Sequence, residues 1–423
     1  MKILLVGKAC STGGAAIASY RLMLSLRGES RDVKMLVQDG EDKYEGIFST
    51  THSLVKRWIN LSRFIAERLV FLPRERSKSI RFLFSLANTG ENIVHHSLVR
   101  QADIIHIHWI NAGFLSLRSL NALLNLGKPV VWTFHDMWPF TGGCHYALEC
   151  DEFMRKCGNC PYLKNPGAGD LSHRIWKKKE RLFSARKFTV ITPSNWLNEC
   201  VRASSLLQHL DVHTIHNPVD SSMFQPAVRE KACNSLGLDP GKKYILFGAA
   251  TVKNVMKGYA FFAEAIEKLS GKVDRDQVEI ILFGKSKGGS PDSFPLLTRN
   301  IAFVHSVDTL VDLYSAAHLF VIPSLQDNLP NTIIESMLCG TPVVGFRTGG
   351  IPEMIDHKAN GYLADFKSSE DLAEGMIWVL SSESYEKLSL ETRETAVKRY
   401  SEKESVDAHI KLYSSLLNKT SST

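Results

Sequence analysis

The chain has 423 residues, 44% of them hydrophobic and 22% charged, and carries a formal net charge of +7. This length is more than one hydrophobic core usually fills, so two domains are expected, and the composition excludes a disordered or fibrous protein. The opening run MKILLVGK is too short for a signal peptide, and no run reaches the roughly 18 apolar residues of a membrane helix. We therefore expect a cytoplasmic protein.

Short apolar runs alternate with helical patterns along the first half, as expected for a parallel sheet with crossover helices. Helices are expected after Gly14, after Asn111 and before Arg186. The expected strands are residues 3–7, 33–37, 104–108, 130–135, 188–192 and 212–216.

Positive charge is concentrated at residues 53–85, which hold eight Lys or Arg against two Glu, interleaved with apolar residues. A basic amphipathic segment of this kind suits an anionic membrane surface, here the inner face of the cytoplasmic membrane. The alternative is a helical insertion whose apolar face packs on its own domain, and both can hold at once. Nucleic acid is not an expected partner, because no nucleic-acid-binding motif accompanies the charge.

The same alternation continues in the second half. Strands are expected at residues 244–248, 278–284, 301–304, 319–322 and 342–346, and helices at about 257–269, 309–316, 329–339 and 370–380. The chain breaks near His216-Asn217-Pro218, where a strand ends in an extended proline turn. The sequence therefore predicts an α/β protein with two Rossmann-like, doubly wound parallel-sheet domains, 1–216 and 217–400, that face one another across a cleft. A last helix is expected at about 401–417.

A glycine pair, Gly13 and Gly14, follows the first strand and precedes a helix. Glycine at this place lets a ligand approach the backbone N–H groups of the helix N-terminus. The spacing is not G-x-G-x-x-G, so a fold that binds NAD is disfavoured.

His135 ends the strand expected at 130–135. This placement puts an imidazole at the carboxyl end of a parallel strand, where open α/β sheets bind ligands. A histidine satisfied within the core is the alternative. His106 and His108, inside the strand I-I-H-I-H, are interpreted as packing or supporting groups.

Four cysteines crowd the segment after His135. Cys144, Cys150, Cys157 and Cys160 form the pattern C-x5-C-x6-C-x2-C. Thiolates at such spacing can close a tetrahedral zinc site that stabilises a long loop with little core of its own. The spacing is not that of a standard finger, and free thiols or a redox pair are the alternatives. Four sulfur ligands leave no open position, so such a zinc ion would be structural.

Two carboxylates, Asp327 and Glu335, stand eight positions apart after the strand expected at 319–322. Asp327 lies in the loop and can reach a sugar hydroxyl. Glu335 lies in the first turns of a helix that opens at Pro330, where the helix dipole keeps a carboxylate ionised, and it can accept both hydroxyls of a ribose. Helix capping is the alternative role for either acid.

Two lysines, Lys253 and Lys257, follow the first strand of the second half, and Gly258 opens the next helix. Ammonium groups at a strand end and helix start can neutralise a diphosphate as it becomes a leaving group. A solvated surface is the alternative for a lysine pair on a loop.

Several of these residues stand in longer motifs: Gly13-Gly14, His135, I-H-N-P-V-D with Phe224, Lys257-Gly258, A-H-L-F-V-I-P-S-L, the acid-x7-Glu element from Asp327 to Glu335, C-G-T-P-V-V, and G-G-I-P-E at 349–353. With them the chain resembles, nearly end to end, the retaining glycosyltransferases of family 4, which have the GT-B fold. The segment W-T-F-H-D-M-W-P-F-T-G-G-C-H-Y with its C-x2-C-P is similar to the subgroup of colanic-acid and other exopolysaccharide or O-antigen transferases.

The resemblance implies three residues that act on the reacting sugar and its leaving group. Lys257 would neutralise the donor diphosphate, Asp327 would contact the transferred sugar, and His135 would hold a hydroxyl of that sugar near the reacting carbon. It also implies a donor-binding set, with Glu335 on the ribose and Gly14 close to the diphosphate. That set is Gly13, Gly14, Lys253, Lys257, Asp327, Asn328, Leu329, Pro330 and Glu335.

The implied function is transfer of a sugar, with retained anomeric configuration, from a nucleotide-sugar donor to a lipid-linked or growing saccharide in surface polysaccharide biosynthesis. No cofactor is required for this chemistry, and the last helix would belong to the N-terminal domain. Two residues depart from the family pattern: Ala249-Ala250 occupy the place of an arginine, and the first acid is Asp327 rather than glutamate. The alternatives are a catalytically silent GT-B subunit at the membrane and a nucleotide-sugar epimerase of the same fold.

Overall fold

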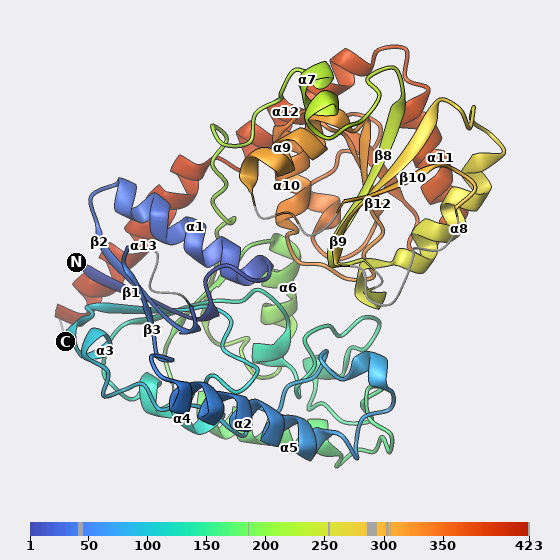
Figure 1. The fold of residues 1–423 in the computed structure, drawn as a ribbon. Helices are drawn as coiled ribbons and strands as arrows, with labels where there is room; N and C mark the ends of the chain where they lie inside the picture. The colour runs from blue at the N-terminus through green and yellow to red at the C-terminus, as the bar shows by residue number, and fades with distance from the viewer. Residues whose placement is uncertain are drawn as a thin grey trace. The chain divides into compact units, whose positions relative to one another are not determined.

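The computed structural model describes residues 1–40, 45–184, 186–252, 254–285, 294–301, 304 and 306–421. The chain forms two compact units (Figure 1). The first comprises Met1–Pro218 together with Lys403–Thr423, and the second comprises Val219–Glu402. Each unit is built on its own parallel sheet, so each is described by itself.

The first unit has a seven-stranded sheet in the order β3-β2-β1-β4-β5-β6-β7, and every pairing in it is parallel. The strands are β1 (Lys2–Ala9), β2 (Asp32–Asp39), β3 (Ile47–Ser49), β4 (Ile104–Ile107), β5 (Val130–Thr133), β6 (Thr189–Thr192) and β7 (Asp211–Thr214). Strand β3 was not predicted, because three residues at a sheet edge give too short a pattern to recognise. Strands β4, β5 and β7 end one or two residues earlier than predicted.

Helices connect these strands, and serine or aspartate side chains cap several of them. Ser53, Ser116, Asp170 and Ser194 each accept a hydrogen bond from a backbone N–H of the first turn that follows. The helices are α1 (Gly14–Gly28), α2 (Leu54–Phe71), α3 (Ser97–Gln101), α4 (Leu117–Leu124), α5 (Leu171–Phe183), α6 (Asn195–Ala203) and α13 (Glu402–Ser421), with 3-10 turns η1 (Lys78–Ile80), η2 (Trp138–Phe140) and η3 (Glu152–Met154).

Helix α13 completes the first unit although it comes last in the chain. Figure 1 shows it, in red, beside α1 and β1, in blue. Its Val406, Leu412 and Tyr413 belong to the same buried cluster as Ile3 and Leu22. Burial of these apolar side chains fixes the helix on the first unit.

The second unit has a six-stranded sheet in the order β10-β9-β8-β11-β12-β13, again parallel throughout. The strands are β8 (Lys243–Thr251), β9 (Val278–Lys285), β10 (Thr298–Ile301), β11 (Leu319–Ile322), β12 (Val343–Phe346) and β13 (Gly361–Ala364). The helices are α7 (Arg229–Ser235), α8 (Tyr259–Ser270), α9 (Val307–Ala316), α10 (Asn331–Leu338), α11 (Ser369–Leu380) and α12 (Tyr385–Arg399), with 3-10 turns η4 (Val255–Lys257) and η5 (Ile351–Glu353).

Two sheets of this kind confirm the predicted α/β, doubly wound fold class. Differences are local. Strand β10 lies before the predicted strand 301–304, of which residues 302 and 303 fall outside the described residues. Strand β13 and the helices α3, α6, α7 and α12 were not predicted. In each sheet the strand order reverses once, between β1 and β4 and between β8 and β11. Ligands of doubly wound sheets bind at the carboxyl ends of the strands beside such a reversal.

Candidate active site

In the second unit, the loops after β8 and β11 bring two predicted residues into contact. Lys257 ends the turn η4, and its Nζ forms an ion pair with Oδ2 of Asp327, in the loop after β11. The Ser324 hydroxyl donates to the same carboxylate oxygen over 3.2 Å. The structure therefore joins the residue predicted to neutralise a diphosphate to the acid predicted to contact a sugar.

Two glycines allow this close packing of loops. Gly258 has φ +68°, and a Cβ there would lie 1.8 Å from the carbonyl oxygen of Pro323. Gly349, with φ +57°, follows β12, and a Cβ there would lie 2.0 Å from the carbonyl oxygen of Asp327. The next amide, that of Gly350, donates to the same oxygen over 3.0 Å. These positions require glycine for both backbone conformation and space.

Glu335 lies in the second turn of α10 and is buried, with 5% of its surface exposed. The hydroxyl of Tyr314, on α9, donates to Oε2 of Glu335 over 3.1 Å. A buried carboxylate needs such donors, because burying an unpaired charge is costly. Tyr314 was missed from the sequence, since nothing in its local pattern points to a residue 21 positions away.

The loop before α10 can contact a ligand through its backbone more than through its side chains. Leu329 is buried in the hydrophobic cluster of the second unit, and Asn328 is also buried. Pro330 occupies the N-cap position of α10 without a side-chain cap. Any contact of Leu329 and Pro330 with a ligand therefore has to come from main-chain atoms or the proline ring.

Strand β8 differs from the prediction in the region that departs from the family pattern. It was expected to end at Gly248 and to be followed by a long loop, but it continues to Thr251, with a register irregularity between Gly248 and Thr251. Ala249-Ala250 are thus part of the strand, because pairing with β9 resumes after the irregularity. Lys253, the predicted substitute for the missing arginine, lies outside the described residues.

In the first unit, the glycine pair lies at the start of α1. Gly13 is the N-cap residue with φ +94°, and Gly14 is the first residue of the 15-residue helix. A Cβ at either position would meet nothing within 4 Å, so the helix N-terminus is open to an approaching group. The positive dipole end of a helix favours an anion at such a position.

His135 lies just beyond β5, which ends at Thr133, and is partly buried. Its Nε2 is 3.0 Å from Nδ1 of buried His108. Nε2 of His108 has no hydrogen-bond partner among the described residues. Since buried N–H groups are almost always paired, the proton of His108 belongs on Nδ1, which donates to His135. Burial lowers the pKa of His135 to about 4, so its ring is neutral and its own proton is on Nδ1.

A separate hydrogen-bonded group lies against these two rings. The His106 ring is tilted against that of His108, with centroids 4.3 Å apart. Its two nitrogens form hydrogen bonds with the hydroxyls of Tyr413 and Thr133, each over 2.7 Å. Burial places the pKa of His106 and of His108 well below the ordinary value. The prediction that both histidines support the site rather than form it agrees with this burial.

A second network fixes the loop immediately after His135. Asp136 accepts hydrogen bonds from His145 Nδ1 over 2.7 Å and from Trp109 Nε1 over 2.8 Å, and His145 Nε2 lies 2.9 Å from the Ser85 hydroxyl. Burial raises the pKa of Asp136, but His145 and the N–H donors outweigh it and hold the pKa below its ordinary value. The order Asp-His-Ser resembles a hydrolytic triad, yet Ser85 is 5% exposed, so it serves to anchor the loop.

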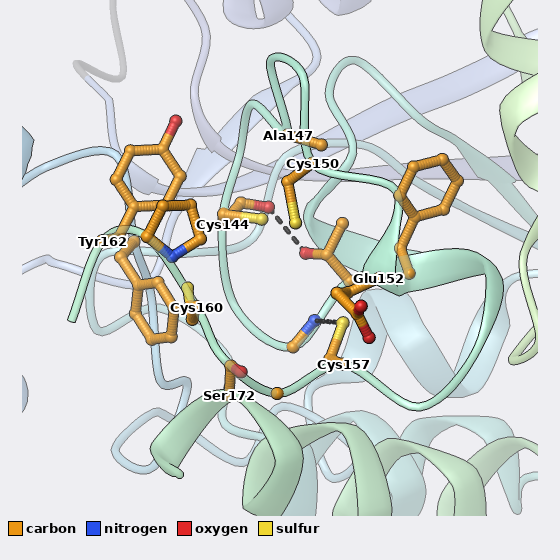
Figure 2. Close-up of a pocket in the computed structure, with 14 residues that line it drawn as sticks. Cys144, Ala147, Cys150, Glu152, Cys157, Cys160, Tyr162 and Ser172 are labelled. Atoms are coloured by element: carbon orange, nitrogen blue, oxygen red, sulfur yellow. Dashed lines mark hydrogen bonds between the residues drawn. The ribbon is translucent and has the colours of Figure 1, made fainter. Parts of the chain in front are cut away.

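Cys144, Cys150, Cys157 and Cys160, the four cysteines of the predicted zinc site, line one small cavity (Figure 2). As the side chains stand, no group of three or more His, Cys, Asp or Glu within the described ranges is arranged to hold a metal ion. The predicted zinc site is therefore not preformed, and it stays a prediction.

The basic segment 53–85 is an α-helix over α2, and the structure shows which face of α2 is outward. Its inward residues are Asn60, Glu67 and Phe71. Glu67 accepts from Arg68 and from the backbone N–H groups of Leu86 and Ala87. The outward face is apolar and basic, with exposed residues Leu54, Val55, Trp58, Ile59, Leu61, Ile65, Leu69 and Val70. The alternative that the apolar face packs on its own domain is therefore wrong for most of α2, because polar groups with specific partners occupy the inward side.

Across the described residues, no helix is both long and apolar enough to traverse a lipid bilayer. Any membrane contact through α2 would thus be at the surface.

Two family models match the chain: glycosyltransferase family 4 over residues 12–222 and glycosyl transferases group 1 over residues 242–382. A D-inositol 3-phosphate glycosyltransferase of Pseudarthrobacter chlorophenolicus is 25% identical over 316 residues, covering 72% of this chain and 68% of the relative. A putative colanic acid biosynthesis glycosyl transferase of Escherichia coli, WcaC, is 24% identical over 309 residues, covering 67% and 71%. The structure of Anabaena HepE with UDP-glucose superposes with a TM-score of 0.65 at 16% identity, covering 98% of this chain and 100% of that one.

Two parallel-sheet units with these similarities define a glycosyltransferase of the GT-B fold. The chain belongs to glycosyltransferase family 4, whose models together match most of both units.

Proposed function

We propose that this enzyme transfers a sugar from a nucleotide-sugar donor, with retained anomeric configuration, to a lipid-linked or growing saccharide of a surface polysaccharide. The observation that carries the proposal is the cluster of Lys257, Asp327 and Ser324 beside the strand-order reversal of the second unit, with Glu335 on the adjoining helix. WcaC is named for colanic acid biosynthesis, and the structure of HepE contains UDP-glucose. These similarities support a polysaccharide acceptor and a nucleotide-sugar donor.

The chemistry follows from charge. As the bond to the diphosphate breaks, the sugar becomes cationic and the leaving group gains negative charge. Lys257 and the N-terminus of α8 would stabilise that departing charge. Lys257 is paired with Asp327, so donor binding has to exchange this carboxylate for phosphate, which frees Asp327 for a sugar hydroxyl. Glu335, held by Tyr314, would receive the ribose. No metal is needed for these steps.

The first unit would supply the acceptor side. Within it, the open helix N-terminus at Gly13 and Gly14 would lie close to the donor diphosphate. His135, with its proton on Nδ1, would donate to a hydroxyl of the donor sugar. These roles come from the family resemblance together with the tautomer argued above.

Substitution of three charged residues tests the proposal. Lys257→Ala should weaken binding of UDP- or GDP-sugars at least tenfold in calorimetry. Asp327→Asn should retain nucleotide binding and lose transfer. Lys242 pairs with Glu279 at the opposite end of β8 and is the matched control, so Lys242→Ala should leave donor binding unchanged. Full transfer activity in Lys257→Ala would overturn the assignment, and an inverted anomeric centre in the product, read by NMR, would overturn retention.

We also propose that the enzyme works at an anionic membrane surface through the outward face of α2. Half of the large hydrophobic residues that are exposed in the described chain, 10 of 20, fall between Leu54 and Phe82. Leu54, Trp58, Leu61 and Ile65 follow one another at helical spacing and form a stripe. Basic side chains lie along the same segment. An interfacial helix has this combination of an apolar stripe and flanking positive charge.

Vesicle binding tests the membrane contact. The enzyme should bind vesicles of phosphatidylglycerol and phosphatidylcholine more tightly than phosphatidylcholine alone, and salt should weaken the binding. Trp58→Glu and Ile65→Glu should abolish it. Leu24 is an exposed apolar residue on α1, 46% exposed, so Leu24→Glu is the control and should bind normally. Equal binding by all variants, or a dimer in solution that buries α2, would overturn the proposal.

A further inference from the structure

The segment between η2 and α5 is long and has little regular structure. Residues 141–170 are all described, and the short turn η3 is the helical element within them. Compact domains seldom contain a loop of this length unless it is held by something other than secondary structure. The segment nevertheless packs on the first unit through Cys160, Tyr162 and Leu163, which join a cluster with Phe71 and Phe84.

All four thiols of this segment line the same cavity of about 20 Å³ (Figure 2). A space of this size holds about one water molecule. The side chains of Cys144, Cys150, Cys157 and Cys160 reach it from separate stretches of the loop, as Figure 2 shows. The remaining cysteines of the chain, Cys10, Cys200, Cys233 and Cys339, do not line it.

Backbone amides are directed at three of the sulfur atoms. The N–H of Gly142 donates to Sγ of Cys157 over 3.2 Å. The N–H groups of Glu152 and Tyr162, each two residues after a cysteine, donate to Cys150 and Cys160. Hydrogen bonds to the charged form of a group favour that form, so these donors suit thiolates better than thiols.

The turn Cys157-Gly158-Asn159-Cys160 has the shape of a short knuckle. Cys157 and Asn159 have φ +41° and +48°, which is uncommon for residues other than glycine. The carboxylate of Asp170 accepts from the N–H of Cys160 over 2.9 Å and from that of Gly167 over 3.3 Å, which fixes the turn. Both cysteines of this turn line the cavity.

A buried ammonium group lies next to the thiols. Lys179, on α5, is 0% exposed, and its Nζ donates to the carbonyls of Trp138 and Thr141 and lies 3.7 Å from the centroid of the Trp138 ring. The acidic groups near enough to interact with this ammonium are Cys144, Cys157 and Asp136. A fully buried lysine is rare unless an opposite charge accompanies it.

Zinc binds thiolates rather than thiols, so binding of the ion would displace the thiol protons. Zn²⁺ with four thiolates carries a net charge of −2, which the buried Lys179 ammonium and the amide donors would partly offset.

We propose that Cys144, Cys150, Cys157 and Cys160 bind one structural zinc ion, with Lys179 as its buried counter-charge. Tetrahedral coordination by four sulfurs is a geometry that zinc adopts in structural sites. The side chains have to rotate toward the cavity centre to reach Zn–S distances of about 2.3 Å. The ion holds the 141–170 segment and takes no part in sugar transfer, since four protein ligands leave no open position.

Metal analysis of the purified full-length enzyme tests the proposal. We expect about one zinc per chain by mass spectrometry, and eight free thiols once the chain is unfolded in chelator. Replacement by Co²⁺ should give the intense visible absorption of tetrahedral cobalt thiolate. Cys144→Ser and Cys157→Ser should each lower the zinc content at least tenfold. The matched controls Cys200→Ser and Cys233→Ser alter cysteines outside the cavity and should keep one zinc.

The other possible results overturn it. Eight free thiols without stoichiometric metal would show that the cysteines are plain thiols. Fewer than eight free thiols would show disulfides, and iron in place of zinc would show an iron–sulfur cluster. The wild-type measurement decides the question even if a serine variant fails to fold. Retention of full zinc in both Cys144→Ser and Cys157→Ser would place the ion elsewhere.

Discussion

Gly349 gives the sharpest test of how the second unit builds its site. The substitution Gly349→Ala adds one methyl group at a position with φ +57°, where that carbon would lie 2.0 Å from the carbonyl oxygen of Asp327. The atom it meets is backbone, which cannot rotate away. Either the loop that carries Asp327 moves or the loop that carries Gly349 does.

The expected cost has two parts that a control separates. A left-handed backbone conformation costs an L-residue about 1–2 kcal/mol. Overpacking against a fixed neighbour costs about 1–3 kcal/mol more. Gly237 has φ +65° with nothing within 4 Å of an added Cβ, so Gly237→Ala bears the first cost alone. We therefore expect Gly349→Ala to lose about 2–5 kcal/mol in total.

Thermal unfolding and donor calorimetry measure the two parts. For a domain of the size of Val219–Glu402, 1 kcal/mol corresponds to roughly 2–4 °C in Tm. Gly349→Ala should unfold at a lower temperature than Gly237→Ala. Its nucleotide-sugar affinity should fall about tenfold if 1.4 kcal/mol of the strain is relieved by moving Asp327. If both variants have the same Tm and the same donor affinity, the close approach of the two loops does not position the site.

Two further predictions concern hydrogen bonding and pH. Tyr314→Phe removes a hydrogen-bond donor to buried Glu335, and a bond to a charged group is worth about 1.5–3 kcal/mol, so nucleotide affinity should fall roughly tenfold in calorimetry. Tyr362→Phe removes a hydrogen bond to Asp371 and should leave nucleotide affinity unchanged. Equal affinities in the two variants would contradict this prediction. Burial lowers the pKa of His409 to about 4, so as pH falls this residue takes up its proton in the unfolded chain before it does so in the folded one. The contribution of His409 to folding stability is therefore complete above pH 6.5 and declines as pH falls toward 4, by up to about 1.4 kcal/mol per pH unit. Denaturation at several pH values should show that the stability of His409→Gln falls less steeply toward acid pH than that of the wild type. An unchanged slope would contradict the role given to His409.

The sequence predicted the parts of the site that are local in the chain. Asp327 and Glu335 lie within one strand-loop-helix unit, so their spacing alone places them at the carboxyl end of β11. Contacts that depend on strand order could not be predicted the same way. The approach of Gly349 to Asp327 requires β12 to lie beside β11, and the bond from Tyr413 to His106 joins residues 307 positions apart. Such pairs follow from tertiary packing, which no local pattern encodes.

Helix α2 shows a different limit. Its periodicity predicted an amphipathic helix, but periodicity does not say which side is buried. The inward side is set by Glu67, whose carboxylate caps two amides of the chain that returns at Leu86 and Ala87. The hydrogen bonds that Glu67 accepts at Oε1 thus hold this side of α2 inward and leave the apolar stripe outward. Without those partners the same sequence would be expected to bury its leucines.

The proposed zinc site and the proposed membrane face are mechanically linked. Bridges Glu75↔Leu163 and Phe84↔Cys144 attach the segment that follows α2 to the cysteine loop, and the amide of Ser85 donates to the carbonyl of Gly143. Loss of the ion should therefore loosen the segment that supports α2. Zinc removal by chelator should weaken binding to anionic vesicles. Vesicle binding that survives complete zinc loss would show that the two features are independent, because the backbone bridges would then hold without the metal.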